Sequence, residues 1–495
     1  MKLKKLLSKA GYQAIQNPDI NYSIRHICCD SRLAQSDSIF VCIKGSLTDG
    51  HLYAGSAYMR GCRAFVAEHA IDVPSDASVI IVDNSRRALA VLSDILYLHP
   101  SEKVKVIGIT GTKGKTSVAM MIYEVLNKCG IPTGYIGTNG IHYAQTHQIS
   151  VNSTPESCNL QYHLYFMAKQ NIKYLILEVS SQALYHERVY GIEFDTCVFT
   201  NLTPDHIGEH EHPSFEHYKS CKASLFSEYK LKRAIVNADD PHTPDIVHKC
   251  NVECDTFGTS VFSHHKASNI SLLKTQNSFG VTFEYTSDDF TSTIHLNTPG
   301  DFSVQNALAT IAVCRNIIPN ISDIISVLSK YSVPGRFEVV HALPYATTII
   351  DYAHNGISLR AVLETLRKYN PNRLICLFGS VGGRTQMRRA ELGKVASSLC
   401  DFCIITADNP DREDPAKINL EIANSFDKNA CDYICISDRK EAIIYAVKML
   451  RQGDILLLAG KGHENFQYIR GEKIPFCERD ILLEAAKDLL EVKVN

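Results

Sequence analysis

The chain has 495 residues, of which 45% are hydrophobic and 21% are charged, and its formal net charge at pH 7 is -2. This length allows about two to four domains with separate cores, and the small net charge argues against a broad surface for nucleic acid or for an anionic membrane. The 17 cysteines are odd in number and lie in apolar runs, which favours reduced thiols in the cytoplasm over a disulfide framework.

The first segment, residues 1–101, mixes short strands with helical pieces. Its basic, apolar start lacks the apolar core and the cleavage site of a signal peptide. No run in the chain approaches the roughly eighteen apolar residues of a membrane span, so we expect a cytoplasmic protein without membrane insertion. Asp30-Ser-Arg32 precedes a strand predicted over residues 38–43, and a polar turn follows at 45–51. Considered alone, such loops are more often surface turns than ligand sites.

A glycine-rich turn follows, with the sequence Ile109-Thr-Gly-Thr-Lys-Gly-Lys-Thr-Ser117. Residues 103–108 before it resemble a buried strand, and apolar residues after it recur at helical spacing. A loop of this kind directs backbone N–H groups at a phosphate, with a lysine for the outer phosphates and a hydroxyl for magnesium. Lys115 and Thr116 have these positions. Ile109 stands where the strict pattern has glycine, so an ordinary strand-to-helix turn is the alternative interpretation.

Residues 102–334 alternate strand and helix signals, which predicts a mostly parallel sheet covered on both faces. The strand over 173–179 ends near Glu178, at the sheet edge where ligands bind, and we expect this carboxylate to contact the nucleotide's metal. The strand over 234–241 carries Asn237, which suits a ribose or a base. A polar stretch of about fifty residues then predicts antiparallel strands, and Asn306 lies in the next helix, where it is either a ligand contact or a plain cap.

Four histidines follow the strand over 197–202, at positions 206, 210, 212 and 217. Such a group raises the question of zinc. The pattern supplies no clean helical pair and no cysteine partner nearby, so a single histidine at a magnesium or phosphate site is the favoured interpretation.

From residue 335 the alternation restarts, with strands predicted over 347–352, 373–379, 401–407, 432–437 and 454–459 and helices between them. This pattern predicts a second, doubly wound domain. Polar clusters follow several of these strands, which predicts a small-molecule site at their carboxyl ends. The clusters are Asp351-Tyr-Ala-His354, Gly382-Gly-Arg384, Asp408-Asn-Pro-Asp411 and Gly460-Lys-Gly-His-Glu464.

Together these motifs resemble the Mur ligases, over nearly the whole chain. In family order the sequence has the phosphate loop, Glu178-Val-Ser-Ser, Thr200-Asn-Leu-Thr-Pro-Asp-His206, Tyr218-x-x-x-Lys222-x-x-Leu-Phe226, Asn237-Ala-Asp-Asp240, Gly335-Arg-Phe-Glu338, Asp351-Tyr-Ala-His354 and Gly460-Lys-Gly-His-Glu464. Any one motif is weakly specific, whereas eight in register are highly specific. Within the family, the chain is most similar to the branch that adds the third residue of the peptidoglycan stem peptide.

The resemblance implies an α/β protein of three domains: a small N-terminal α/β domain for the uridine nucleotide (1–101), a central ATPase with a mostly parallel sheet (102–334) and a C-terminal Rossmann-like domain for the amino acid (335–495). The implied enzyme is an ATP-dependent, ADP-forming ligase. The D-glutamate γ-carboxylate of UDP-MurNAc-L-Ala-D-Glu attacks the γ-phosphate of ATP, and the amine of a free amino acid then displaces phosphate from the acyl phosphate. We expect a monomer.

The resemblance also implies roles for individual residues. Lys115, Lys222 and His206 would be catalytic. Two magnesium ions would be held by Thr116, Glu178, His206 and a Lys222 that carbon dioxide converts to a carbamate, because an ammonium group has no lone pair to offer a cation. ATP would contact Gly111, Thr112, Lys113, Gly114, Lys115, Thr116, Ser117, Asn237, Asn306, Arg336, Asp351 and His354. UDP-MurNAc-dipeptide would contact Ser31, His51, Ser153, Thr154, Ser180 and Arg188. The amino acid would contact Arg384, Asp408, Asn409, Asp411, Gly460 and Glu464.

The chain departs from the family most clearly at Asp408-Asn-Pro-Asp411. Members that add meso-diaminopimelate usually have arginine where Asp411 stands, to pair with the distal carboxylate, and an aspartate reverses the sign of that contact. An anionic pocket suits an amine, so L-lysine or L-ornithine is favoured, with Arg384 for the α-carboxylate. Asn355-Gly356 resembles the lysine-adding branch, which supports the same choice. meso-Diaminopimelate is the alternative, with Arg412 as the compensating cation.

Two competing functions remain open. A folylpolyglutamate synthetase-like ligase shares the phosphate loop and the domain order, but it lacks a uridine-nucleotide domain, whereas about a hundred residues precede the loop here. A non-catalytic ATP-binding partner subunit is the other. Retention of the five residues Lys115, Thr116, Glu178, His206 and Lys222 argues against it.

Overall fold

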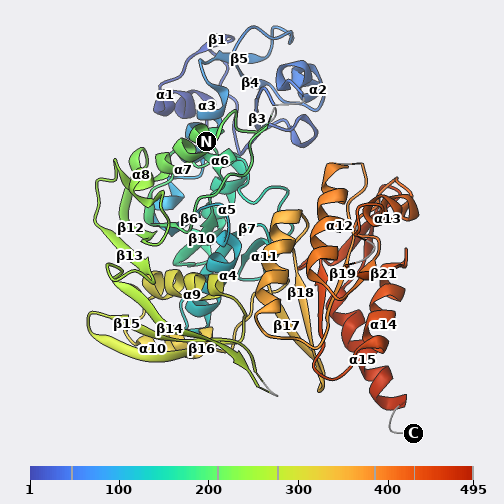
Figure 1. Cartoon of the computed structure of the whole chain (residues 1–495). Coiled ribbons are helices and arrows are strands. Elements are labelled where there is room, and N and C mark those ends of the chain that lie inside the picture. The colour runs from blue at the N-terminus through green and yellow to red at the C-terminus, as the bar shows by residue number, and fades with distance from the viewer. Residues whose placement is uncertain (46–47, 209–210, 276–277, 384–385, 428–429, 493–495) are drawn as a thin grey trace. The chain divides into compact units, whose positions relative to one another are not determined.

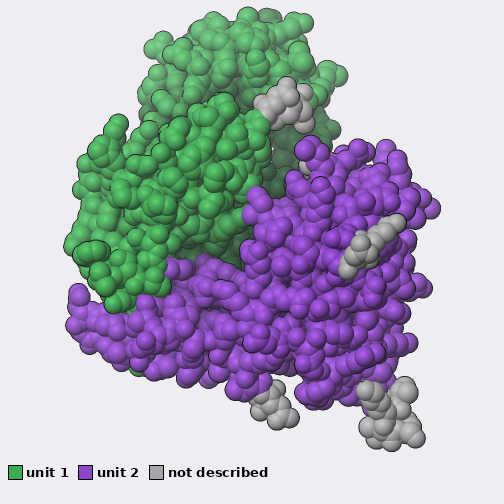
Figure 2. Space-filling model, viewed as in Figure 1, with its two compact units in different colours: residues 1–266, 308–324 green, residues 267–307, 325–495 purple. Residues whose placement is uncertain are grey.

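The computed structural model describes residues 1–495 except 46–47, 209–210, 276–277, 384–385, 428–429 and 493–495 (Figure 1). Two compact units make up the chain, coloured separately in Figure 2. Unit 1 comprises residues 1–266 and 308–324, and unit 2 comprises residues 267–307 and 325–495. Among the described residues, no helix is both long and apolar enough to cross a membrane.

The N-terminal part of unit 1 is built on a five-stranded sheet in the order β1-β5-β4-β3-β2, in which only β1 is antiparallel to its neighbour. The strands are β1 (Ala14–Gln16), β2 (His26–Cys28), β3 (Ser38–Val41), β4 (Ala64–Ala67) and β5 (Ser78–Ile81). The helices are α1 (Leu3–Ala10), η1 (Ser31–Leu33), η2 (Gly50–Tyr53), α2 (Ala54–Met59), α3 (Ser85–Leu96) and η3 (Pro100–Glu102). Apolar residues of β3, β4, α1 and α3 form one core cluster.

The central sheet of unit 1 runs in the order β13-β12-β11-β6-β10-β7-β8-β9, parallel from β13 to β7 and antiparallel beyond. The strands are β6 (Lys105–Thr110), β7 (Thr133–Gly137), β8 (Gly140–Tyr143), β9 (Thr146–Gln148), β10 (Tyr174–Glu178), β11 (Phe194–Phe199), β12 (Leu231–Asn237) and β13 (Cys254–Gly258). The helices are α4 (Lys115–Lys128), α5 (Ser157–Lys169), α6 (Ser181–Tyr185), α7 (Phe215–Ser227) and α8 (Thr243–Val247). Strands β6, β10 and β11 lie side by side, so the segments after them meet at one sheet edge.

Three elements contain the division between the units: β14 (His265–Lys274), α9 (Asp301–Cys314) and α10 (Ile321–Leu328). In unit 2, β15 (Phe279–Ser287) and β16 (Phe290–Leu296) form an antiparallel hairpin, as predicted for the polar stretch.

The C-terminal part of unit 2 has a six-stranded sheet in the order β17-β18-β22-β19-β20-β21. The strands are β17 (Glu338–Leu343), β18 (Ala346–Asp351), β19 (Leu374–Phe378), β20 (Phe402–Ile405), β21 (Asp432–Cys435) and β22 (Ile455–Ala459), followed by the hairpin β23 (Phe466–Ile469) and β24 (Glu472–Pro475). The helices are α11 (Gly356–Arg367), α12 (Met387–Leu399), α13 (Pro415–Ala423), α14 (Arg439–Met449) and α15 (Glu478–Val492). The five predicted strands are present and parallel, and β17 adds an antiparallel edge that the sequence pattern did not indicate.

Candidate active site

The glycine-rich turn joins β6 to α4 and depends on two glycines with positive φ. Gly111 has a φ of 147°, and a Cβ atom there would lie 2.0 Å from the Thr200 hydroxyl oxygen. Gly114 has a φ of 85° and precedes the first residue of α4. Other residues rarely adopt these angles. The turn therefore leads directly into a helix N-terminus, where backbone N–H groups and the helix dipole favour a phosphate.

Two lysines converge on the main chain of this turn. Lys115 Nζ donates to the carbonyl oxygens of Gly111 and Thr112, at 2.8 and 3.0 Å, and Lys222 Nζ donates to that of Gly111 at 2.9 Å. Lys222 comes from α7 and is 1% exposed, with Nζ 4.5 Å from the ring centre of Tyr218. Burial first, and the Lys115 charge second, lower the pKa of Lys222 well below its ordinary value. A lower pKa favours the neutral amine, which is the nucleophilic form of the group.

Glu178 ends β10 beside this turn and is 1% exposed. Its oxygens accept hydrogen bonds from the Thr116 hydroxyl (2.9 Å), the Tyr135 hydroxyl (2.6 Å), and the N–H and hydroxyl of Thr138 (2.9 and 3.1 Å). A buried carboxylate and an adjacent hydroxyl supply the oxygen ligands that Mg²⁺ prefers. Thr116 and Glu178 thus fit a magnesium ion, whereas Lys222 as an amine does not and as a carbamate would.

His206 is held differently from the other residues expected to bind metal. It is exposed, has a φ of 55°, and its Nδ1 lies 2.8 Å from Glu211 Oε1. Its ring lies 6.2 Å from that of Tyr218, whose hydroxyl is 3.0 Å from Thr112 Oγ1. The histidine therefore neighbours the turn through Tyr218, while Glu211 takes its Nδ1.

Other residues expected to bind ATP within unit 1 lie in or beside the turn. Lys113 is exposed, with its ammonium 3.4 Å from Asp205, and Ser117 is partly buried in α4. The Asn237 side chain is 7% exposed, and it donates to the Thr200 carbonyl oxygen at 2.8 Å and accepts from the Asp239 N–H at 2.9 Å. In this structure the Asn237 amide thus holds the strand end.

Part of the set expected to bind UDP-MurNAc-dipeptide forms one network at the end of β10. Thr154 Oγ1 donates to the Glu178 carbonyl oxygen at 2.7 Å and accepts from the Ser180 N–H at 3.1 Å. Arg188 donates to the Thr154 carbonyl oxygen at 3.2 Å and to Glu156 Oε1 at 2.9 Å. These contacts fix Thr154, Ser180 and Arg188 relative to the metal ligand candidate Glu178.

The remaining members of that set are Ser153, partly buried beside Thr154, and Ser31 and His51 in the N-terminal part of unit 1. Ser31 begins η1 and is partly buried. His51 is 8% exposed; its Nδ1 lies 2.6 Å from Asp49 Oδ1, and its Nε2 accepts from the Glu68 N–H at 3.0 Å. Both ring nitrogens of His51 therefore have protein partners here, which is the arrangement of a structural histidine.

Unit 2 contains the other residues expected to bind ATP. Asn306 is buried in α9. Asp351 accepts from the N–H groups of Phe337 and Ala353, each at 2.8 Å, and burial raises the pKa of its carboxyl. The Arg336 guanidinium lies 4.7 Å from the ring centre of Tyr352, and His354 Nδ1 lies 2.8 Å from the Tyr352 carbonyl oxygen. Tyr352 thus connects Arg336 with His354.

The amino-acid candidates line a cavity of about 670 Å³ in unit 2. Asp408, Asn409, Asp411, Gly460 and Glu464 all contribute to its wall, as do Arg388 and Arg412. Arg384 lies outside the described residues. Gly460 has a φ of 112°, and a Cβ atom there would lie 3.2 Å from Asp408 Oδ2. The prediction of a small-molecule site at these strand ends therefore corresponds to a cavity with most of the expected residues.

The expectation of an anionic pocket is wrong for the described residues. Lys461 is fully buried, and its ammonium donates to Asn409 Oδ1 and Glu464 Oε2, both at 3.0 Å, and lies 3.7 Å from Asp408 Oδ1. The Lys461 ammonium therefore already lies close to the carboxylates of Glu464 and Asp408. With Arg388 and Arg412 also in the wall, the acidic groups are matched by basic ones, and the pocket suits a ligand that carries both charges.

Sequence reasoning missed several residues that shape these sites. Lys461 lies inside the Gly460–Glu464 motif, but the pattern does not show that it faces inward. Tyr135 and Thr138 come from β7 and the turn after it, and only the pairing of β7 with β10 brings them to Glu178. Arg388 belongs to α12 and has no motif around it.

Comparisons with known proteins agree with the motifs. The family model of the Mur ligase middle domain matches residues 109–314, and that of the Mur ligase, glutamate ligase domain matches residues 335–462. The UDP-N-acetylmuramoyl-L-alanyl-D-glutamate--2,6-diaminopimelate ligase of Caldanaerobacter subterraneus subsp. tengcongensis is 37% identical over 485 residues, which is 98% of each chain. The chain belongs to the Mur ligase family. It is accordingly an ATP-dependent ligase, and the three-domain α/β fold expected from the sequence is confirmed.

Solved structures give the same result for the fold. A UDP-N-acetylmuramoyl-L-alanyl-D-glutamate--2,6-diaminopimelate ligase matches with a TM-score of 0.69 and 25% identity over 97% of both chains. A folylpolyglutamate synthase of Mycobacterium tuberculosis matches with a TM-score of 0.59 and 15% identity, over 82% of this chain and 94% of its own. The second likeness concerns the fold alone, so full-length sequence identity favours the Mur ligase over the folylpolyglutamate alternative.

Proposed function

We propose that this Mur ligase adds the third residue of the peptidoglycan stem peptide to UDP-MurNAc-L-Ala-D-Glu, using ATP. The support is the similarity to the 2,6-diaminopimelate ligase of Caldanaerobacter, whose name contains UDP-N-acetylmuramoyl-L-alanyl-D-glutamate. That protein is 37% identical to this chain over 98% of both chains. The observation that carries the chemistry is the group formed by the phosphate turn, the Thr116–Glu178 pair and buried Lys222. We also propose the domain boundaries 1–101, 102–334 and 335–495, and a cytoplasmic location.

The proposed reaction has two steps. The D-glutamate γ-carboxylate attacks the γ-phosphate of ATP, which releases ADP and forms an acyl phosphate. The amine of the incoming amino acid then attacks the acyl carbon, and phosphate leaves. Transfer of a phosphoryl group between anions requires positioning and charge neutralisation more than a protein nucleophile, so cationic Lys115 and the N–H groups at the start of α4 suit the first step.

Magnesium fits the oxygen ligands of Thr116 and Glu178, and it would neutralise phosphate charge when bound. A carbamate on Lys222 would add a further anionic oxygen ligand beside the turn. The lowered pKa of Lys222 supports this modification, because only the neutral amine can attack carbon dioxide. His206 stays a proposed ligand, one that would have to exchange its contact with Glu211.

For the amino acid we propose meso-diaminopimelate, which was the alternative from the sequence. Its distal end carries an ammonium and a carboxylate, whereas that of L-lysine carries an ammonium alone. The pocket wall offers Asp411 beside Arg412, together with Arg388, so both charges of meso-diaminopimelate find an opposite charge. The relatives named above are likewise named as 2,6-diaminopimelate ligases.

Phosphate release tests the proposal, with ATP, Mg²⁺ and UDP-MurNAc-L-Ala-D-Glu and a scan of single amino acids. We expect turnover with meso-diaminopimelate, and loss of it in Thr116→Val but not in the matched control Thr293→Val, at an exposed threonine of β16. Arg412→Ala should raise the KM for meso-diaminopimelate. Turnover with L-lysine or L-ornithine instead would overturn the proposed amino acid and keep the ligase, while no turnover with any amino acid would overturn the function.

A further inference from the structure

Two histidines and a cysteine form a compact cluster in unit 1 that the proposed reaction does not use. His212 Nδ1 lies 2.9 Å from His217 Nδ1, and Cys221 Sγ lies 3.9 and 3.8 Å from these two atoms. His217 and Cys221 are four residues apart on α7, so their side chains share one face of the helix. His212 comes from the segment that precedes the helix. All three ligand atoms lie within 4.8 Å of one another.

The separations match those of a tetrahedral zinc site. With Zn–N bonds of about 2.0–2.1 Å and Zn–S bonds of about 2.3 Å, ligand atoms lie roughly 3.3 Å apart for two nitrogens and roughly 3.6 Å apart for nitrogen and sulfur. The observed distances differ from these by a few tenths of an ångström. Small side-chain rotations would therefore bring all three atoms to one ion.

Neighbouring side chains contact both histidine rings of the cluster. His212 is fully buried, and its Nε2 lies 2.9 Å from the Ser181 hydroxyl oxygen. A contact to the second ring nitrogen is the usual way in which metal-binding histidines are oriented. The Tyr218 ring packs against His212 with centroids 5.3 Å apart, and the Tyr185 ring packs against His217 at 4.9 Å.

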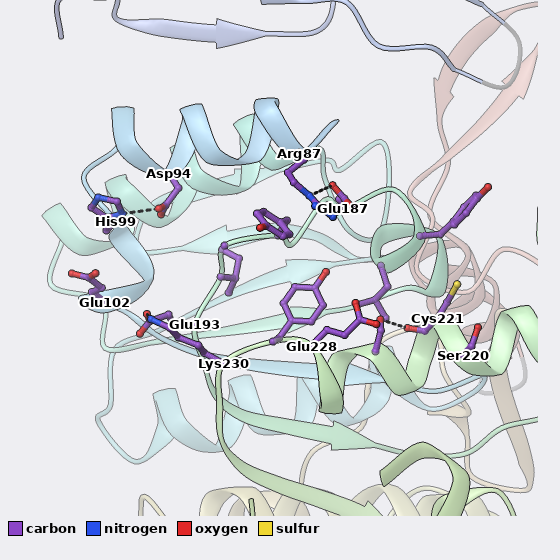
Figure 3. A pocket seen from close by; sticks show the side chains of 17 residues that line it. Arg87, Asp94, His99, Glu102, Glu187, Glu193, Ser220, Cys221, Glu228 and Lys230 are labelled. Carbon is purple, nitrogen blue, oxygen red and sulfur yellow. Dashed lines mark hydrogen bonds and ion pairs between the residues drawn. The ribbon is translucent and has the colours of Figure 1, made fainter. Parts of the chain in front are cut away.

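A cavity borders the cluster. Cys221 lines this cavity of about 650 Å³, together with Tyr185 and Ser220, and Figure 3 shows Cys221 on the cavity wall. A metal would displace a proton from the Cys221 thiol, as it does at other thiolate sites.

We propose that His212, His217 and Cys221 form a binding site for Zn²⁺ or a similar borderline-soft divalent cation. Imidazole and thiolate ligands select such cations against Mg²⁺, which prefers oxygen. The sequence-based argument against zinc is wrong in one respect, because Cys221 supplies both the cysteine and the helical pair with His217. A bound ion would join His217 and Cys221 of α7 to His212, which contacts Ser181 of α6. Cys221 is next to Lys222 in the sequence and Ser181 is next to Ser180, so this link would lie beside the proposed active site.

Cobalt binding to metal-free, full-length protein in excess Mg²⁺ tests this site. Co²⁺ should produce a thiolate-to-cobalt charge-transfer band and tetrahedral d–d bands that saturate at one equivalent, and Zn²⁺ should abolish both. Cys221→Ser should lose the charge-transfer band, and His217→Asn should weaken binding at least 10-fold. The control Cys477→Ser, at another partly buried thiol, should titrate like the unaltered chain.

Either of two results would overturn the proposed metal site. One is a wild-type protein without the charge-transfer band, and the other is a Cys221→Ser variant that keeps this band. Circular dichroism of each variant shows whether it is folded, and if Cys221→Ser fails to fold, the His217→Asn titration decides. The absorption readout needs no turnover, so it is independent of the proposed ligase reaction.

Discussion

Lys222 is the residue on which the proposed chemistry depends most. Its amine is buried and donates to the Gly111 carbonyl oxygen, which also accepts from Lys115. A lysine in an arbitrary helix is usually solvated, whereas burial here costs the ammonium its hydration. Burial therefore favours the neutral amine of Lys222, which is the form that the proposed carbamate requires.

Replacing Lys222 with methionine should lower turnover by about 100-fold or more, since a fixed charge or ligand at a reacting phosphate is worth at least that much. The fold should survive, because methionine has a similar length and Gly111 keeps its contact with Lys115. Phosphate release measures the first effect, and the carbamate resonance after addition of ¹³C-bicarbonate measures the modification. Lys219→Met on the same helix should keep both signals. Unchanged turnover in Lys222→Met would remove the carbamate hypothesis.

At single positions, the sequence predicts the residues that belong to a motif and misses contacts that form only when the chain folds. Thr116 and Glu178 were expected near the same metal, and the structure has their side chains in contact. Lys461 was not expected to matter, because sequence spacing does not show that its side chain is buried. Cys221 stands four residues after His217, so the spacing does offer that pair, whereas the approach of His212 to Cys221 depends on how the chain folds before α7.

Among the elements, the turn between β6 and α4 tolerates the least change. Gly111→Ala should destabilise the fold by about 1–3 kcal/mol, the usual cost of such a backbone angle, and should weaken binding of a non-hydrolysable ATP analogue at least 10-fold. The clash with the Thr200 hydroxyl would displace the turn. Gly130→Ala is the matched control: its φ is 78°, with nothing within 4 Å of the added Cβ. Denaturant unfolding and calorimetric titration measure both, and wild-type affinity in Gly111→Ala would contradict the role of the turn.

Periodicity predicted the parallel strands well because each is a short apolar run between helical segments, as in β19 and β22. Strand β17 was missed for a physical reason. Its burial alternates irregularly, and its register with β18 shifts between Val340 and Leu343. An edge strand that is only partly buried lacks the continuous apolar run that identifies a central strand.

At the scale of the whole molecule, each unit has its own apolar cores, and unit 2 also has a buried ion pair. Arg439 opens α14 and Glu478 opens α15, and their side chains are 0% and 1% exposed with 2.8 Å between guanidinium and carboxylate. Arg439 further donates to the carbonyl oxygens of Ala407 and Ala459, at 3.1 and 2.8 Å. One side chain thus joins two helices to the ends of two strand segments.

Arg439→Met should lower the stability of unit 2 by about 3–5 kcal/mol, the usual cost of leaving a buried charge without its partner. Burial raises the pKa of Glu478, and Arg439 opposes that rise, so the variant should raise this pKa further. A carboxyl with a raised folded-state pKa stabilises the fold only where it is protonated, and loses that contribution as the pH rises through its folded pKa. The loss of unfolding free energy in Arg439→Met should therefore be smaller at pH 5 than at pH 8.

Urea unfolding followed by circular dichroism measures this loss, because the chain has no tryptophan to report by fluorescence. Hydrogen exchange assigns the effect to α14 and α15. Exposed Arg451→Met is the control, and an equal loss at both pH values would show that Glu478 is not the group left unpaired.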